Sequence, residues 1–286
     1  MTIGELLKEY RISQGKKQKE FIDSGTIISQ SFYSKVEKNV HKIAADSLVD
    51  ILHYNNIPVW EFFSRLNQSD EIKHQQIESF NKIMSDAFYD NDKKKVENLK
   101  PLIKESNLSE KDKQEELLLV KAWLELMKKN TTKPDIELRK KIKDKIFDIP
   151  NFNYNKISLF CNFMKFYDFN SNKIISKKII EQNISSNSIK IQTAILAIIV
   201  NILAFSLKDG KENDTGYFIE NGNKIKTRPE LVFYKSAFYF FENIVDYSLT
   251  KNNASYNKCQ NTKDFLANIG MSKYSKVLEQ LLAKYN

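Results

Sequence analysis

A group of polar side chains around residue 30 could form hydrogen bonds with the edges of DNA bases. Tyr33 and Val36 are three residues apart, so both fall on one face of a helix that is predicted to start near Ser29. The remaining surface of that helix carries amide, hydroxyl and ammonium groups: Gln30, Ser31, Ser34 and Lys35. Because such groups can pair with base edges from a helix in the major groove, the segment is a candidate for contact with DNA.

Two preceding segments are predicted to support this helix. Thr2 and Glu5 have the spacing of a capping box, at the start of a first helix expected to run to about Ser13. The apolar face of that helix consists of Ile3, Leu6, Leu7 and Tyr10. A second helix is expected from Gln18 to Ser24, before Gly25, which suits a tight turn with a positive φ. The three segments together predict a compact arrangement of short helices.

Two further helices are expected to complete a five-helix domain over residues 1–68. A fourth helix is predicted to end at Asn55 and Asn56, and its apolar face consists of Leu48, Ile51 and Leu52. Pro58, which is favourable at the first position of a helix, is expected to open a fifth. The aromatic residues of that fifth helix are Trp60, Phe62 and Phe63.

The position of the positive charge agrees with a nucleic-acid partner. The chain has a formal net charge of +9, which by itself indicates little because many helical proteins are basic. Within the first domain, however, the basic residues exceed the acidic ones in residues 1–43 and not in residues 44–68. The excess therefore lies in the part that contains the candidate helix.

These residues also resemble a known family. Arg11, Gly15, Gln18 and Gly25, followed by the run from Ser29 to Glu37, look like the helix-turn-helix of phage-repressor-type regulators. More narrowly, the run from Ser31 to Glu37 resembles the recognition helix of Rgg-type (Rgg/GadR/MutR) regulators, which respond to peptides. The resemblance is fairly specific because the spacing, the turn glycine and the glutamate agree together.

The resemblance implies that the third helix binds in the major groove. The base-facing candidates are then Gln30, which can pair with adenine, Ser31, and Lys35, which can reach guanine or a phosphate. Gln18, at the start of the second helix, is a candidate for a phosphate contact. The further candidates for DNA backbone contacts are Lys17, Ser29, Ser34 and Lys38. Capping alone for Ser29 and solvation alone for Ser34 stay open as alternatives.

Three residues near this helix are assigned other roles. Glu37 is expected to pair with Arg11 and hold the first helix against the third, as in the repressor-type domains that the chain resembles. Phe32 is expected either to contact a thymine methyl or to pack within the domain. Asn39 stands where the family usually has glycine, and asparagine tolerates a positive φ nearly as well.

Residues 69–286 read as a succession of amphipathic helices. Segments are expected to begin near Asp70, Asp92, Ser109, Pro134, Asn155, Asn172, Asn187, Lys211, Arg228 and Asn253. Two helices with their turns then take about 40 residues, as in helical-hairpin repeats such as tetratricopeptide arrays. The tetratricopeptide signature itself does not occur. The overall expectation is an all-α protein: a five-helix DNA-binding domain, 1–68, followed by a tetratricopeptide-like helical-repeat domain, 69–286, for ligand sensing and dimerisation.

A solenoid of this kind can hold an extended peptide along its concave face. Candidate peptide-binding residues interrupt the apolar faces of the later helices: Lys165, Asn201, Tyr234, Phe238 and Asn243. Ordinary core packing is the alternative for Tyr234 and Phe238. An unpartnered buried amide costs about 1–3 kcal/mol, so Asn201 is expected to have a partner, either a ligand or a neighbouring carbonyl.

The resemblance to Rgg-type proteins further implies a short, mostly apolar signalling peptide and a homodimer formed through the repeat domain. The positive charge of that domain would suit an acidic group or carboxylate on the peptide. The aromatic segment from Glu230 to Tyr247 and the terminal segment from Lys273 to Tyr285 are expected to form the dimer contact or to cap the last repeat.

Other classes of function find little support in the sequence. No phosphate-binding glycine loop, nucleophile elbow or His-Glu-x-x-His pattern occurs, and His41, His53 and His74 are isolated, so neither an enzyme nor a cofactor is expected. Cys161 and Cys259 are single, which argues against a disulfide or metal site and for a reducing cytoplasm.

Membrane insertion is not expected either. No charged leader precedes an apolar stretch, and the most apolar run, 194–207, is shorter than the roughly 20 residues that span a bilayer. Two alternatives to a peptide-controlled regulator remain. One is a helix-turn-helix repressor controlled by a protein partner on its repeat domain, and the other is a scaffold whose first domain has lost DNA affinity.

Overall fold

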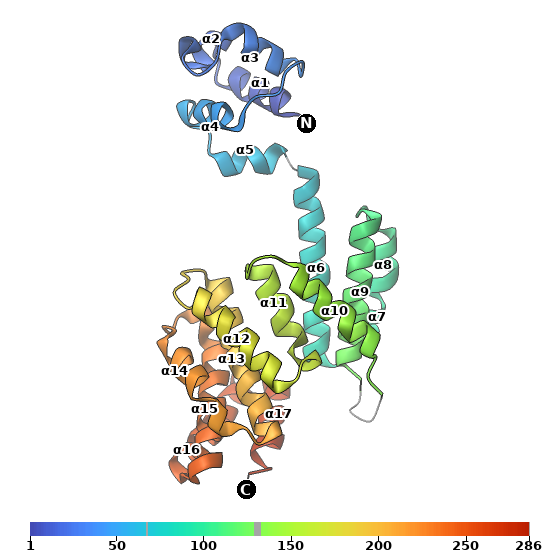
Figure 1. The fold of residues 1–286 in the computed structure, drawn as a ribbon, viewed down its shortest axis with the longest axis vertical. Helices are drawn as coiled ribbons and strands as arrows, with labels where there is room; N and C mark the ends of the chain where they lie inside the picture. The colour runs from blue at the N-terminus through green and yellow to red at the C-terminus, as the bar shows by residue number, and fades with distance from the viewer. Residues whose placement is uncertain (67, 129–132, 286) are drawn as a thin grey trace. The chain divides into compact units, whose positions relative to one another are not determined.

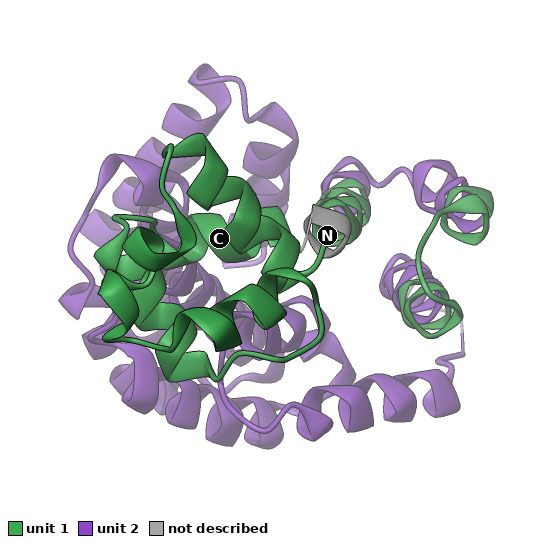
Figure 2. Ribbon diagram, turned by 90° about the horizontal axis from the view of Figure 1, so that it is seen from above, with its two compact units in different colours: residues 1–85, 101–116 green, residues 86–100, 117–286 purple. Residues whose placement is uncertain are grey.

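The computed structural model describes residues 1–66, 68–128 and 133–285, and every regular element in these ranges is a helix (Figure 1). The chain divides into two compact units (Figure 2). Unit 1 comprises residues 1–85 and 101–116, and unit 2 comprises residues 86–100 and 117–286. The predicted domain boundary between residues 68 and 69 stays a prediction, whereas the predicted all-α class is confirmed.

The first five helices form at the places where their caps and apolar spacing predict them. They are α1 (Ile3–Ser13), α2 (Gln18–Phe21), α3 (Gln30–Glu37), α4 (Ala45–Tyr54) and α5 (Val59–Leu66). The capping box of α1 is present, because Thr2 Oγ1 accepts from the Glu5 N–H and the Glu5 carboxylate accepts from the Thr2 N–H. One expectation was wrong: α2 ends at Phe21 rather than Ser24. Asp23 and Ser24 have positive φ values of 50° and 53°, which an α-helix cannot accommodate.

One apolar core holds these helices together. Its fully buried members come from each of the first five helices and include Leu6, Leu7, Phe21, Ile22, Tyr33, Ile51, Leu52 and Phe62. Burying a large apolar side chain contributes about 1.5–3 kcal/mol, so this cluster is the main source of stability for a domain of this size. Of the three aromatic residues of α5, only Phe62 joins the core; Trp60 is 74% exposed.

The later helices mostly begin where polar caps stand in the sequence. They are α6 (Gln68–Asp90), α7 (Lys93–Glu97), α8 (Leu99–Glu105), α9 (Glu110–Leu126), α10 (Ile136–Asp148), α11 (Tyr154–Phe163), α12 (Phe169–Asn183), α13 (Ile189–Asp209), α14 (Gly216–Lys224), α15 (Val232–Thr250), α16 (Asn253–Asn268) and α17 (Ser272–Leu282). Two predicted starts were wrong: α12 begins at Phe169 rather than near Asn172, and α14 begins at Gly216 rather than near Lys211. Asp168 caps α12 by accepting from the Ser171 N–H at 2.9 Å, and Asn172 is buried inside the helix.

Helix α13 is the central helix of unit 2. It packs against α11, α12, α14 and α15, and α15 in turn packs against α16, which contacts α17. Its 21 residues are long and apolar enough to cross a membrane, so the expected argument from a short apolar run does not hold. However, 56% of its most apolar window is buried inside the protein by the neighbouring helices. Helix α13 is therefore accounted for as a core helix.

Candidate DNA interface and candidate ligand-binding cluster

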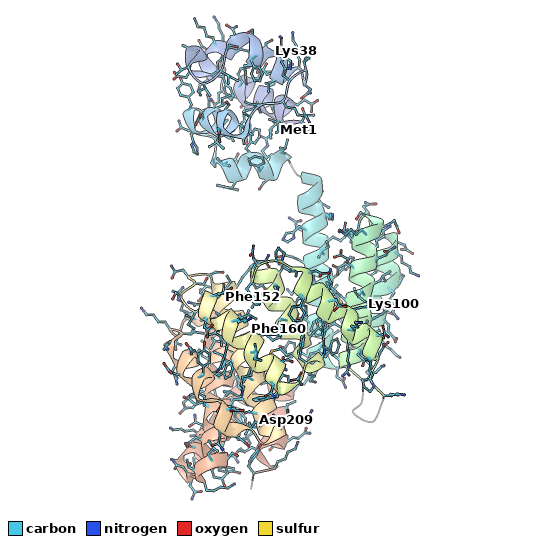
Figure 3. The ribbon with its side chains drawn as sticks, viewed as in Figure 1. Met1, Lys38, Lys100, Phe152, Phe160 and Asp209 are labelled. Carbon is cyan, nitrogen blue, oxygen red and sulfur yellow. The ribbon has the colours of Figure 1, made fainter. Side chains whose placement is uncertain are left out.

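Helix α3 presents the predicted polar surface to solvent. Gln30, Ser31 and Lys35 are exposed, and Ser34 is partly exposed, while Tyr33 and Val36 are buried beneath them. Lys38 follows the helix directly and is exposed as well (Figure 3). The residues that the sequence assigned to base reading therefore lie together on one helix, as its periodicity predicted.

Ser29 acts as the cap of α3. Its hydroxyl oxygen accepts from the Phe32 N–H at 3.3 Å and lies 3.3 Å from the hydroxyl of Ser31. The capping role that stayed open in the sequence is therefore present, and because Ser29 is exposed its hydroxyl also stays accessible from solvent. Lys17, at the start of α2, is exposed too.

A buried ion pair anchors α3 to α1. The Arg11 guanidinium donates two hydrogen bonds to the Glu37 carboxylate, from Nε at 2.6 Å and from Nη2 at 3.0 Å. Only 14% of the Arg11 side chain and 4% of the Glu37 side chain are exposed. The predicted structural role of Glu37 is confirmed, and the paired, fork-like geometry fixes the orientation of α3.

Gln18 belongs to the same network. Its amide nitrogen donates to the second oxygen of Glu37 at 2.7 Å, so the side chain is engaged inside the domain. Only the backbone N–H groups at the start of α2 remain for a phosphate, and the side-chain contact proposed from the sequence would require this bond to break. This hydrogen bond was not predictable from the sequence, because local spacing does not show in which direction an amide side chain points.

Hydrogen bonding outweighs burial in setting the protonation state of Glu37. Burial raises the pKa of its carboxyl group, but hydrogen bonds from Arg11 and Gln18, together with the charge of Arg11, bring it below its ordinary value. The same pair raises the pKa of Arg11. Burial also raises the pKa of the Tyr33 hydroxyl. The pair is therefore ionised at neutral pH.

Residues at the edges of α3 take structural roles. The Phe32 ring packs against the core and stacks on His41 with ring centroids 5.6 Å apart, which favours the packing interpretation. Asn39 has a φ of 58°, a positive value that the glycine usual at this position in the resembling family would also adopt. A contact that the sequence did not indicate joins α2 to α4: the buried amide of Asn55 donates to the Phe21 carbonyl at 2.8 Å.

In unit 2, three of the five candidate ligand residues are associated with α11 and the 3₁₀ turn that follows it. The Asn201 amide of α13 has only weak partners there, the Cys161 carbonyl at 3.5 Å and the Met164 sulfur at 3.6 Å. Tyr234 of α15 is close enough to Tyr89 and to Cys161 for their charges to interact. We call Tyr89, Cys161, Lys165, Asn201 and Tyr234 the Cys161 cluster.

The titratable groups of the Cys161 cluster are partly buried but remain accessible to solvent. Burial raises the pKa of the Cys161 thiol to about 12. Burial is also the main cause of the raised pKa of Tyr234, and the charge of the neighbouring Tyr89 is the second cause. Cys161 and Tyr234 nevertheless keep part of their surface accessible, and Tyr89 is 56% exposed. Such partly enclosed polar groups are typical of ligand-binding sites.

Lys165 is in the 3₁₀ turn Met164–Phe166 that follows α11, and its side chain is exposed. Its ammonium nitrogen lies 5.7 Å from the centroid of the Phe88 ring, and no carboxylate of the described residues forms an ion pair with it. Desolvation, and then repulsion from Lys208, lower its pKa. A negative group on a ligand would offset the repulsion between Lys165 and Lys208.

Phe238 and Asn243 lie outside the Cys161 cluster. Phe238 is 3% exposed, and its ring covers Gly222 so closely that a Cβ atom at Gly222 would lie 2.4 Å from it, which fits the core-packing alternative. Asn243 is nine residues after Tyr234, and at 3.6 residues per turn the two face opposite sides of α15. The five candidates therefore do not form a single site.

Tyr89 was not among the candidates derived from the sequence. It is in the last turn of α6, and the residues that it approaches are far along the chain, in α11 and α15. An aromatic residue on an amphipathic helix gives no signal of such a distant partner. Its place in the cluster follows only from the fold.

The all-helical fold of the later part of the chain agrees with a family comparison. The model of the C-terminal domain of the HTH-type transcriptional regulator Rgg matches residues 99–280. The chain belongs to the Rgg family. Members of this family are transcription regulators and not enzymes, so the prediction of a non-enzymatic regulator is confirmed.

The Rgg chain is also similar to solved structures along nearly its whole length. The Streptococcus dysgalactiae SHP pheromone receptor Rgg2 is 16% identical, with 100% of both chains covered and a TM-score of 0.65. A Listeria monocytogenes EGD-e protein described as a transcriptional regulator is 18% identical, with 99% and 96% covered and a TM-score of 0.63.

A third similar structure is that of a bacterial peptide pheromone/receptor complex. It is 18% identical, with 99% of this chain and 98% of that chain covered and a TM-score of 0.57. At these identities the likeness to the solved structures shows the fold alone. No curated protein matches the Rgg chain.

Proposed function

We propose that this Rgg-family chain is a cytoplasmic DNA-binding regulator whose activity is controlled by a short signalling peptide. The observation that carries the DNA-binding part is the exposed row of Gln30, Ser31 and Lys35 on a helix fixed by the Arg11–Glu37 pair. A helix held in this way can present its polar face to the major groove without reorganising. Lys17, Ser29, Ser34 and Lys38 then contact the DNA backbone.

Two substitutions separate base reading from backbone binding. Gln30→Ala is expected to weaken binding to the operator by about tenfold and to leave binding to scrambled DNA unchanged, because a lost bidentate base contact costs about 1–3 kcal/mol. Lys17→Ala is expected to weaken binding to both DNAs alike and to lower the salt dependence by about one phosphate contact. The measurement is a titration of full-length protein against its upstream intergenic DNA across a salt series.

Equal effects of Gln30→Ala on operator and scrambled DNA would remove its base-reading role. The matched control is Gln114→Ala, which removes an exposed glutamine side chain on α9, outside α3. No specific binding by the wild-type protein would leave the alternative of a scaffold that has lost DNA affinity.

The Cys161 cluster is the proposed peptide contact. Its polar groups come from α6, α11, α13 and α15, and several of them lack strong partners within the protein. Asn201 has spare hydrogen-bonding capacity for a peptide main chain, and Lys165 has unneutralised charge for a carboxylate. The similarity to a pheromone receptor and to a peptide pheromone/receptor complex supports this assignment at the level of the fold.

Charge at Lys165 gives a direct test. Lys165→Gln is expected to weaken binding of a short apolar peptide with a free carboxylate by about tenfold, because one ion pair in a partly desolvated site is lost. It should not weaken the amidated form of the same peptide. The measurement is fluorescence anisotropy with labelled peptides encoded near the gene.

Lys178→Gln is the matched control, since it makes the same charge change at an exposed position of α12. Equal weakening by both variants would show a general charge effect instead of a contact. Equal loss for the acid and the amide would contradict the proposed carboxylate partner of Lys165.

A protein partner is the second candidate for control of the regulator. Val232, Tyr239 and Phe265 are 41%, 43% and 46% exposed and line an apolar pocket of about 370 Å³ on α15 and α16. Exposed apolar surface of this kind suits a protein contact, including the proposed homodimer through α15 and α17. DNA binding that responds to no peptide but changes with a protein partner would favour this candidate.

A further inference from the structure

A basic turn follows α3, and a C-terminal helix cap fixes its backbone. The Asn39 N–H donates to the Val36 carbonyl at 2.9 Å, and the Val40 N–H donates to the Lys35 carbonyl at 2.9 Å. Together with the φ of 58° at Asn39, these two hydrogen bonds form a Schellman motif, which ends a helix at a left-handed residue. The turn therefore leaves α3 in one defined direction.

The Asn39 side chain adds a contact that a glycine at this position could not make. The Thr2 hydroxyl donates to the Asn39 amide oxygen at 2.6 Å, across 37 residues of sequence. The same hydroxyl oxygen accepts from the Glu5 N–H at 3.2 Å. One hydroxyl group therefore links the cap of α1 to the turn after α3. Figure 3 labels Met1 and Lys38, which precede these two residues in the chain.

A ring contact supports the other side of the turn. The His41 ring stacks on the Phe32 ring of α3, with centroids 5.6 Å apart and an angle of 16° between the planes. The turn is thus held to α1 through Asn39 and to α3 through His41. A segment that is already ordered costs less conformational entropy when a ligand binds to it.

The turn carries positive charge that the protein itself does not neutralise. Lys38 and Lys42 are exposed, and among the described residues no carboxylate forms an ion pair with either of them. No acidic residue occurs between positions 38 and 45. Because the turn is joined to the end of α3, DNA read by Gln30 and Lys35 would have phosphates close to these two ammonium groups.

We propose that Lys42 is a further phosphate contact, and that Asn39 is a positioning residue that holds Lys38 and Lys42 toward the DNA backbone. This inference rests on the proposed DNA binding. Its physical basis is preorganisation, since the bond between Thr2 and Asn39 orders the turn before DNA arrives. Glycine at position 39 would keep the backbone conformation but release the turn from α1.

Titration of the full-length protein with its upstream intergenic DNA and with scrambled DNA, across a salt series, tests both residues. Lys42→Gln is expected to weaken binding to both DNAs alike and to lower the salt dependence by about one phosphate contact. Asn39→Gly is expected to weaken binding to both DNAs by about threefold, because the turn must then be ordered on binding. The two effects should be less than additive in the double variant, since Asn39 acts through the lysines.

Asn91→Gly is the matched control, because Asn91 is also exposed and has a positive φ of 53° but lies outside the N-terminal helices. It should leave affinity and salt dependence unchanged. Lys42→Gln changes only an exposed side chain, so the phosphate contact can be measured even if Asn39→Gly unfolds.

The outcomes separate this inference from the proposed function. Fully additive effects of Asn39→Gly and Lys42→Gln would overturn the positioning role, and an unchanged salt dependence in Lys42→Gln would overturn the phosphate contact. Both results would leave DNA binding by the protein intact. No DNA binding by the wild-type protein would overturn the proposed function and this inference together.

Discussion

Gly4→Ala is expected to destabilise the N-terminal five-helix domain by about 3 kcal/mol, the upper end of the range for overpacked sites. A Cβ atom at Gly4 would lie 2.0 Å from the Val36 carbonyl oxygen and 2.9 Å from the Asn39 amide oxygen. The first of these atoms is backbone in the last turn of α3 and cannot rotate away. Helices α1 and α3 must therefore separate to admit a single methyl group.

Hydrogen–deuterium exchange of the α1 and α3 amides, together with operator binding, measures this effect. Gly4→Ala should speed exchange across both helices and reduce specific DNA affinity, since α3 loses its support. The matched control is Gly216→Ala at the start of α14, where a Cβ atom meets nothing within 4 Å. That substitution should be neutral or stabilising by up to about 1 kcal/mol. Unchanged exchange in Gly4→Ala would contradict the close contact between the helices.

The N-terminal domain could be predicted from the sequence because its signals are local. The capping box of Thr2 and Glu5, the cap at Ser29 and the helical spacing of Tyr33 and Val36 each act within one turn, and all three are present. The pairing of Arg11 with Glu37 is not local. It was predicted only because the residues resemble a family in which this pair recurs.

Failures in the same domain have a common physical cause. The Gln18 amide bonds to Glu37, and Asn55 bonds to the Phe21 carbonyl, in each case across separate helices. Such hydrogen bonds depend on which polar groups the tertiary packing shields from solvent. Composition and residue spacing do not predict which groups these are. The early end of α2 was missed as well, because positive φ values at Asp23 and Ser24 are uncommon for these residue types.

For the later helices, the sequence predicted where the helices lie along the chain better than it predicted which residues share a helix face. Apolar periodicity located the helices, but polar interruptions of that pattern did not show which side of α15 each residue occupies. Tyr234 joins the Cys161 cluster, whereas Asn243 lines a separate cavity on the other side of α15. A helix that packs on several neighbours has more than one inward face, so its polar residues can serve different sites.

Breaking the ion pair between Arg11 and Glu37 is expected to have the other large effect. Arg11→Met leaves a carboxylate that is 4% exposed without its cation, and loss of one partner of a buried pair typically costs about 3–5 kcal/mol. Urea unfolding of the full-length protein, followed by exchange of the α1 and α3 amides, measures the loss. Glu37→Gln in the Arg11→Met background should recover part of it, because no buried charge then remains.

The pH dependence of the same variant distinguishes a lost charge pair from lost packing. In the wild type the folded pKa of Glu37 is lowered, so its stabilisation is present above the unfolded pKa of about 4.3 and is lost as the pH falls through the folded pKa. Without Arg11, burial should raise the folded pKa above 4.3. Arg11→Met should then lose stability as the pH rises from about 4.3 towards 7, whereas the double variant should not. Parallel pH profiles for the two variants would show that Arg11 stabilises the domain through packing and not through the charge of Glu37.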